Sequence, residues 1–86
     1  PSPMVQLNRC VPLAMLDRNE EALRELDTLA PSLGEHYKHA VVRGWLFAKL
    51  GRIDEAGNAY AEAIGKCTNA PERRHLEREH QRCRGG

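Results

Sequence analysis

This sequence of 86 residues has no long apolar run and no large excess of positive or negative charge. No stretch approaches the roughly 20 consecutive apolar residues of a membrane-spanning helix, and the N-terminus lacks the basic start and apolar core of a secretory signal. The 13 Lys and Arg residues stand against 12 Asp and Glu, so the formal net charge is +1. We therefore expect no membrane partner and no strong electrostatic attraction to nucleic acid.

Cysteine is scarce, odd in number and widely spaced, at Cys10, Cys67 and Cys83. A secreted disulfide framework in so short a chain would show an even set at closer spacing. The pattern favours a reducing compartment, so we expect a cytoplasmic protein. Cys10 and Cys67 are expected to act as small core residues.

Motifs for metal binding and catalysis are missing as well. Three pairs of possible ligands have helical spacing: His36 with His39, His75 with Glu79, and His80 with Cys83. A zinc site needs three or four converging ligands, and neither Cys-x-x-Cys nor His-Glu-x-x-His occurs. Nothing indicates the orienting group or oxyanion hole that a cysteine–histidine nucleophile requires. We expect a non-catalytic chain with no metal site, no cofactor and no small-molecule substrate.

Helical periodicity is the feature that the sequence does have, and it is clearest from residue 40 to residue 63. Apolar or small residues recur there every three to four positions on both sides of Gly51, the pattern of two amphipathic helices. Glycine enters the left-handed conformation at little cost, so Gly51 is expected to end the first helix. Gly44 and Ala56 are small enough to let the two helices approach closely.

Five helices are expected in total. They cover residues 2–16, with a kink at Pro12, then 20–30, 37–50, 53–67, and from a cap at Asn69 to about residue 83. Pro31 and Gly34 are expected to end the second helix. Residues 1–84 are interpreted as one domain, with 85–86 as a frayed tail.

An internal repeat relates the first half of the chain to the second. A shift of 34 residues places Leu16 on Leu50, Arg18 on Arg52, Glu21 on Glu55 and Ala22 on Ala56. This is the period of the tetratricopeptide repeat, a helix–turn–helix unit. The expected fold is all-α, an α-solenoid fragment with two tetratricopeptide-like hairpins and a C-terminal capping helix.

Three separated strings carry a narrower resemblance. They are Ser2-Pro3-x-Val5-x-Leu7-Asn8-Arg9-x-Val11, His39-Ala40-x-x-Arg43-x-x-Leu46-x-x-x-Leu50-Gly51-Arg52, and Asn69-x-Pro71-Glu72-Arg73-Arg74-x-Leu76. Together they resemble the C-terminal extension of a group of bacterial extracytoplasmic-function RNA polymerase sigma factors. In that group a helical, tetratricopeptide-like region follows the two sigma domains.

The resemblance spans nearly the whole chain and implies a role in supporting transcription initiation through protein contacts. The implied partners are the sigma domains of the parent chain or subunits of RNA polymerase. The sigma domains themselves are absent from these residues, so promoter reading is not implied. Because the sequence starts at Pro1 rather than at Met, we expect a piece of a longer protein. The alternative is a stand-alone tetratricopeptide adaptor that binds peptides.

The candidate partner-binding surface is the face formed by the first helix of each hairpin, which lines the concave side of a tetratricopeptide array. Six apolar residues are predicted to lie there: Met4, Leu7, Val11, Met15, Val41 and Trp45. Exposed apolar patches of this kind mark partner surfaces, and tryptophan is enriched at binding hot spots. The alternative, given equal weight, is that another part of the parent chain covers these side chains, which would make the partner intramolecular.

Two polar residues near the centre of the repeat are interpreted as structural rather than functional. His39 and Arg43 occupy positions where a buried polar group needs a partner. An acid such as Glu55 or Glu62 is the expected partner.

The C-terminal arginines are predicted not to make the chain a strong DNA binder. Glutamates are interleaved with the arginines along this helix, which favours ion pairs at helical spacing. In a titration of the isolated chain with duplex DNA at physiological salt, we expect only weak binding. A dissociation constant of about 100 nM or tighter with a steep salt dependence would contradict this interpretation.

Overall fold

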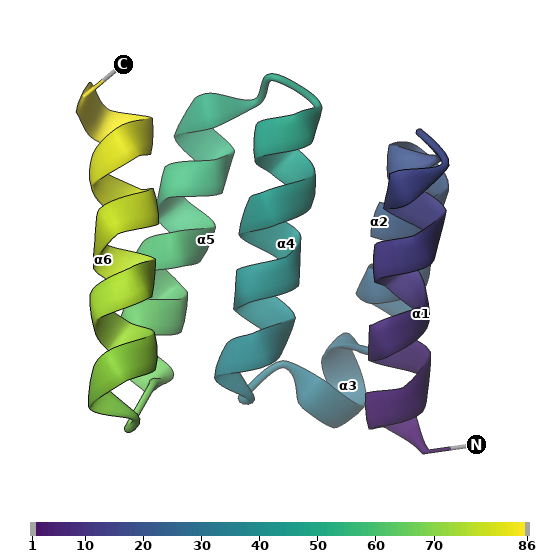
Figure 1. Cartoon of the computed structure of the whole chain (residues 1–86). Helices are drawn as coiled ribbons and strands as arrows, with labels where there is room; N and C mark the ends of the chain where they lie inside the picture. The colour runs from purple at the N-terminus through teal and green to yellow at the C-terminus, as the bar shows by residue number, and fades with distance from the viewer. Residues whose placement is uncertain (1, 86) are drawn as a thin grey trace.

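The computed structural model describes residues 2–85, and all regular secondary structure in this range is α-helical (Figure 1). The helices are α1 (Pro3–Met15), α2 (Asn19–Thr28), α3 (Ala30–Leu33), α4 (Tyr37–Lys49), α5 (Ile53–Lys66) and α6 (Ala70–Gly85). Within the described range, no helix has the length and apolar character needed to cross a bilayer.

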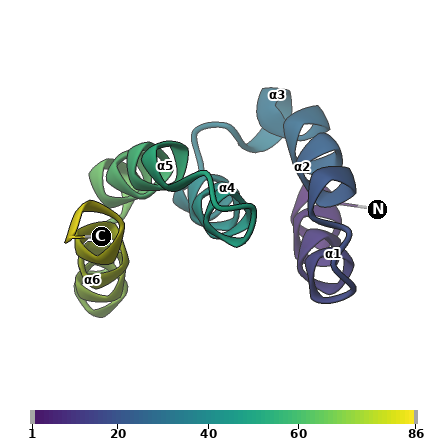
Figure 2. The ribbon, with the colours of Figure 1, turned by 90° about the horizontal axis from the view of Figure 1, so that it is seen from above.

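The helices form a curved layer rather than a ball. Helices α1 and α2 make one antiparallel hairpin and α4 and α5 make a second, while α6 runs along α5 (Figure 1). Seen from above, α1, α4 and α6 follow the concave side of the layer, and α2 and α5 follow the convex side (Figure 2). The chain measures 34 × 27 × 18 Å along its principal axes, as a thin layer should.

The 34-residue spacing in the sequence is also a spacing in the structure. Helices α1 and α4 begin at Pro3 and Tyr37, and α2 and α5 begin at Asn19 and Ile53. Each of these pairs of starting residues is 34 positions apart. Ser2 and His36, also 34 apart, cap α1 and α4 through side-chain acceptors.

The two hairpin turns are equivalent bond by bond. Asp17 has a φ of 62° and Gly51 a φ of 76°, and these are the positive-φ residues of the described chain. The next residue in each turn, Arg18 or Arg52, forms an ion pair with the glutamate three positions later, at 2.7 Å and 2.6 Å respectively. The prediction that Gly51 ends the first helix of its hairpin is therefore confirmed, and the first hairpin uses the same turn with an aspartate.

The second hairpin is held together by a close approach at Gly44. A Cβ atom placed on Gly44 would lie 3.2 Å from ring atoms of Tyr60, tighter than ordinary van der Waals contact. The close neighbour is thus the side chain of Tyr60. Ala56 and Ala63, on the same helix as Tyr60, are fully buried. The absence of a side chain on Gly44 therefore makes room for the Tyr60 ring, and the expected close approach of the two helix backbones stays a prediction.

One polar contact joins the two hairpins, and another joins the two helices of the second hairpin. Nε2 of the buried His39 lies 2.9 Å from the carbonyl oxygen of Leu26 in α2. The predicted acidic partner of His39 is therefore wrong, because a backbone carbonyl takes that place. Arg43 does pair with Glu62, at 3.7 Å.

The structure corrects the number of helices expected from the sequence, while the kink at Pro12 stays a prediction. There are six helices within residues 2–85, because the segment around Pro31 forms the separate short helix α3. Proline is tolerated there, since the first turn of a helix needs no N–H donor. Helix α1 runs through Pro12 to Met15, near its end, where the lost bond falls on the exposed side. Helix α6 includes Gly85, and the remaining ends of the predicted domain and tail, Pro1 and Gly86, lie outside the described residues.

Ala56 and Ala61 provide a matched test of the hairpin packing. Ala56 is fully buried and Ala61 is exposed on the same helix. We expect Ala56→Leu to lower the unfolding free energy by about 1–3 kcal/mol, because added methylene groups overpack a filled core. Ala61→Leu should leave it almost unchanged. Equal midpoints in circular dichroism melts of the two variants would contradict the packing.

Candidate partner-binding groove

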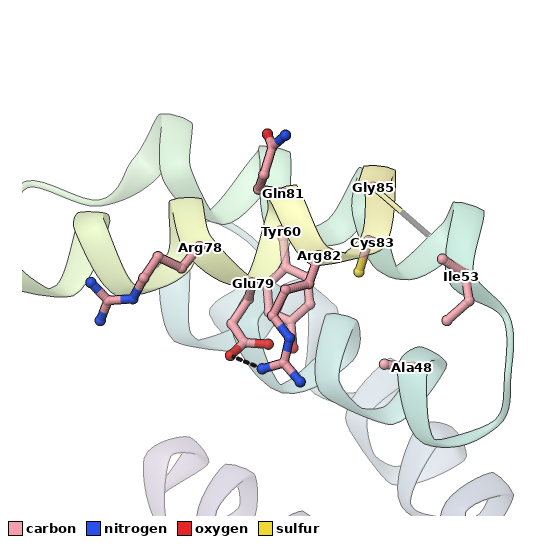
Figure 3. A pocket seen from close by; sticks show the side chains of 9 residues that line it. All are labelled: Ala48, Ile53, Tyr60, Arg78, Glu79, Gln81, Arg82, Cys83 and Gly85. Atoms are coloured by element: carbon pink, nitrogen blue, oxygen red, sulfur yellow. Dashed lines mark hydrogen bonds and ion pairs between the residues drawn. The ribbon is translucent and has the colours of Figure 1, made fainter.

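A groove runs along the concave side between α4 and α6, and Tyr60 of α5 forms its floor. Its volume is about 540 Å³, and Val41, Trp45 and Ala48 line it from α4 while Leu76, Glu79 and Arg82 line it from α6. The groove opens into a neighbouring hollow of about 780 Å³ toward the end of α6 (Figure 3). Ala48, Tyr60, Glu79 and Arg82 border both, so the two form one surface.

The apolar part of the groove comes from residues that are only partly covered by the fold. Val41 and Trp45 are half-buried and pack against the core from α4. Leu76 is fully buried and anchors α6 to the layer. Because α6 carries few other large apolar residues, it lies against α5 without closing the groove over Trp45.

Charged groups lie along the rim. The Lys49 ammonium is 5.2 Å from the centre of the Trp45 ring, within the range of a cation–π interaction. Arg82 pairs with Glu79 at 3.1 Å beside Tyr60, while Arg78 projects away from the ring (Figure 3). Within residues 2–85, Lys49 and Arg78 have no ion-pair partner. The rim therefore carries an excess of positive charge.

Tyr60 is the residue whose ionisation the groove changes most. It is 5% exposed. Burial raises its pKa to about 12, with smaller contributions in the same direction from Glu79 and Cys83 and an opposing one from Arg82. The phenol therefore stays neutral at physiological pH and acts as an apolar surface with one polar edge.

The six predicted partner-binding residues lie in three different environments: the groove, the surface of α1 and the core. Val41 and Trp45 lie in the groove. On α1, Met15 is 70% and Val11 38% exposed, while Met4 is partly buried against the core. Leu7 is 1% exposed and belongs to the core, so its assignment to an open surface is wrong. Its position on α1 is rotated by about 60° from that of Met4, enough to face inward.

The α6 side of the groove was not anticipated from the sequence. Helix α6 reads as a solvated capping helix because charges dominate it, and its pairing of Glu79 with Arg82 does follow that expectation. The overlooked signal is the seven-residue spacing of Leu76 and Cys83, two turns apart on one face. That face is the one that meets α5, since a Cβ on Gly57 would lie 3.6 Å from Cβ of Cys83.

The histidines and cysteines serve the fold in other ways. His36 caps α4 by accepting a hydrogen bond from the Lys38 N–H, and His39 bonds to a carbonyl. Cys10 and Cys67 are buried, as predicted, and burial raises the pKa of the Cys10 thiol. Within residues 2–85, no three side chains of the metal-ligating types converge.

The raised pKa of Tyr60 predicts that the folded chain loses stability at alkaline pH. Its pKa is raised from 10 to about 12 in the folded chain. The neutral phenol therefore contributes fully to the unfolding free energy below pH 10, and this contribution is lost as the pH rises through 12. Two pKa units correspond to at most about 2–3 kcal/mol of unfolding free energy. Urea melts between pH 9 and pH 12 should show this loss in the wild type and a smaller one in Tyr60→Phe. Tyr37→Phe, a control at a half-buried tyrosine outside the groove, should keep most of the wild-type slope. An unchanged slope in Tyr60→Phe would refute the assignment.

Comparison with known proteins places the chain beside a much longer relative. No protein-family model matches it, and no solved structure gives a significant match. The chain is 39% identical over 72 residues to the uncharacterized protein R00370 of Rhizobium meliloti (strain 1021). This match covers 84% of the chain and 17% of the relative, so the chain spans less than a fifth of that protein's length.

Proposed function

We propose that this chain is a non-catalytic, tetratricopeptide-like interaction domain of a bacterial extracytoplasmic-function sigma factor. Its role is to support transcription initiation by binding another protein surface, either the sigma domains of the parent chain or a subunit of RNA polymerase. The observation that carries the interaction role is the groove between α4 and α6, where Val41 and Trp45 remain partly open.

The tetratricopeptide-like character rests on the equivalence of the two hairpins. Their first helices start 34 residues apart, their turns repeat the same positive-φ residue, and their arginine–glutamate pairs recur at the same spacing. That period and a helix–turn–helix unit are the marks of the repeat. A polar helix at the C-terminal end, such as α6, is what a short array needs to stay soluble.

The interaction role follows from what the groove exposes. A half-buried tryptophan beside aliphatic side chains offers apolar area that a partner can remove from water, at about 25 cal/mol per Å² before ordering costs. The excess cations at Lys49 and Arg78 favour a partner segment that combines apolar and acidic side chains.

The length of the Rhizobium relative supports a domain within a larger protein over the alternative of a stand-alone peptide-binding adaptor. The sigma-factor assignment itself rests on the three sequence strings described above. The strings lie in α1, α4 with its following turn, and the start of α6, and they include the buried residues His39, Leu46 and Leu76.

Trp45→Ala tests the groove as the working surface. We expect the variant domain to stay folded, because Trp45 is only half-buried, and we expect its partner affinity to fall by about thirtyfold, or about 2 kcal/mol. Two measurements are paired: a thermal melt of the variant, and in vitro transcription by the full-length factor with RNA polymerase.

Tyr37→Ala is the matched control, since Tyr37 is a half-buried aromatic residue of the same helix that stacks on His36 outside the groove. The control should leave transcription unchanged. A folded Trp45→Ala variant with full transcription would mean that the groove is not the working surface. An unfolded one would mean that Trp45 belongs to the core.

A further inference from the structure

Helix α1 presents a second apolar surface, on the side away from the groove. Val5 is 52% exposed, and Leu16, directly after the helix, is 69% exposed. Together with the exposed Pro12 they occupy positions i, i+7 and i+11, which fall on one face of a helix. We call these three residues the edge stripe. Met4, Val11 and Met15 point from a different face of α1.

The structural repeat shows what this face does in the second hairpin. The residues 34 positions after the edge stripe are His39, Leu46 and Leu50 of α4 and its cap. His39 is 5% and Leu46 0% exposed, and Leu50 is packed partly into the core. His39 contacts the carbonyl of Leu26 in the preceding hairpin. In the second hairpin this face is therefore the one that receives the hairpin before it.

The two ends of the layer differ in how they are finished. The outer side of α6 is covered by exposed charged residues, including Arg73, Arg74 and Glu77, as a terminal helix requires. On the face of the edge stripe the charged residue of α1 is Arg9, and the three apolar side chains remain exposed beside it. Beside it lies a hollow of about 370 Å³, bordered by Arg9, Pro12, Leu13 and Leu16 from the α1 side and by Glu21 and Glu25 from α2. This end of the layer therefore presents exposed apolar side chains next to a hollow.

We propose that the edge stripe is the docking face for a further helical hairpin of the same polypeptide, stacked on α1 in the register of the 34-residue repeat. Val5 stands where His39 stands in the second hairpin, so this contact is made by apolar side chains instead of a hydrogen bond to a helix end. The surface is separate from the groove, and the proposal does not depend on the function proposed for the groove.

Cysteine labelling of the complete gene product tests this docking. Leu16→Cys and Val5→Cys are introduced singly into a Cys83→Ser background, since Cys10 and Cys67 are already buried. Ala61→Cys, on the exposed convex side, is the matched control. We expect both edge-stripe cysteines to react with a maleimide about tenfold or more slowly than the control.

The labelling rates are then compared before and after about a hundredfold dilution. Protection that persists on dilution supports a hairpin of the same polypeptide. Protection that is lost on dilution shows a second copy or another molecule on the stripe and overturns the proposal. Edge-stripe cysteines that react as fast as Ala61→Cys also overturn it, because the face is then open in the complete protein.

Discussion

One buried hydrogen bond, between His39 and the carbonyl oxygen of Leu26, sets how the second hairpin sits on the first. The carbonyl lies in the last turn of α2, where it also accepts a hydrogen bond from the Leu29 N–H at 3.0 Å. Leaving the buried imidazole nitrogen of His39 without a partner would cost about 1–3 kcal/mol, so the contact tolerates little sliding of α4 along α2. The orientation of α4 in turn determines which of its side chains point toward α6. The groove around Trp45 therefore depends on a bond at the other face of the same helix.

Local sequence signals are enough to predict most of the helical architecture. All five expected helices have counterparts that begin within one residue of expectation, because caps and small residues act over a few positions. The hairpin pairing was also predictable, since the same turn signals recur after 34 residues and a short turn forces antiparallel neighbours. Ala56 and Ala63 are fully buried, and their spacing of seven residues matches one face of α5.

The predictions from the sequence were wrong where contacts between distant segments outweigh the local sequence pattern. Helix α3 was missed because Pro31 reads as a breaker, although proline also suits a first helical turn. Leu7 was placed on the open face because its spacing fits a stripe, whereas the neighbouring helices bury it. The α6 side of the groove could not be derived from its charged sequence. It depends on how Leu76 and Cys83 seat α6 against α5, which no single segment specifies.

The shared turn also gives the layer a gradient of local stability. Gly51 adopts its left-handed conformation freely, whereas Asp17 must hold a φ of 62° with a side chain in place, at a cost of about 1 kcal/mol. The second hairpin has Phe47 and Tyr60 in its core, where the first has the smaller Leu13 and Leu26. Opening motions should therefore begin at the α1–α2 hairpin and reach α4 and α5 last. The N-terminal end of the layer is thus the adaptable one, and the half that carries the floor of the groove is the rigid one.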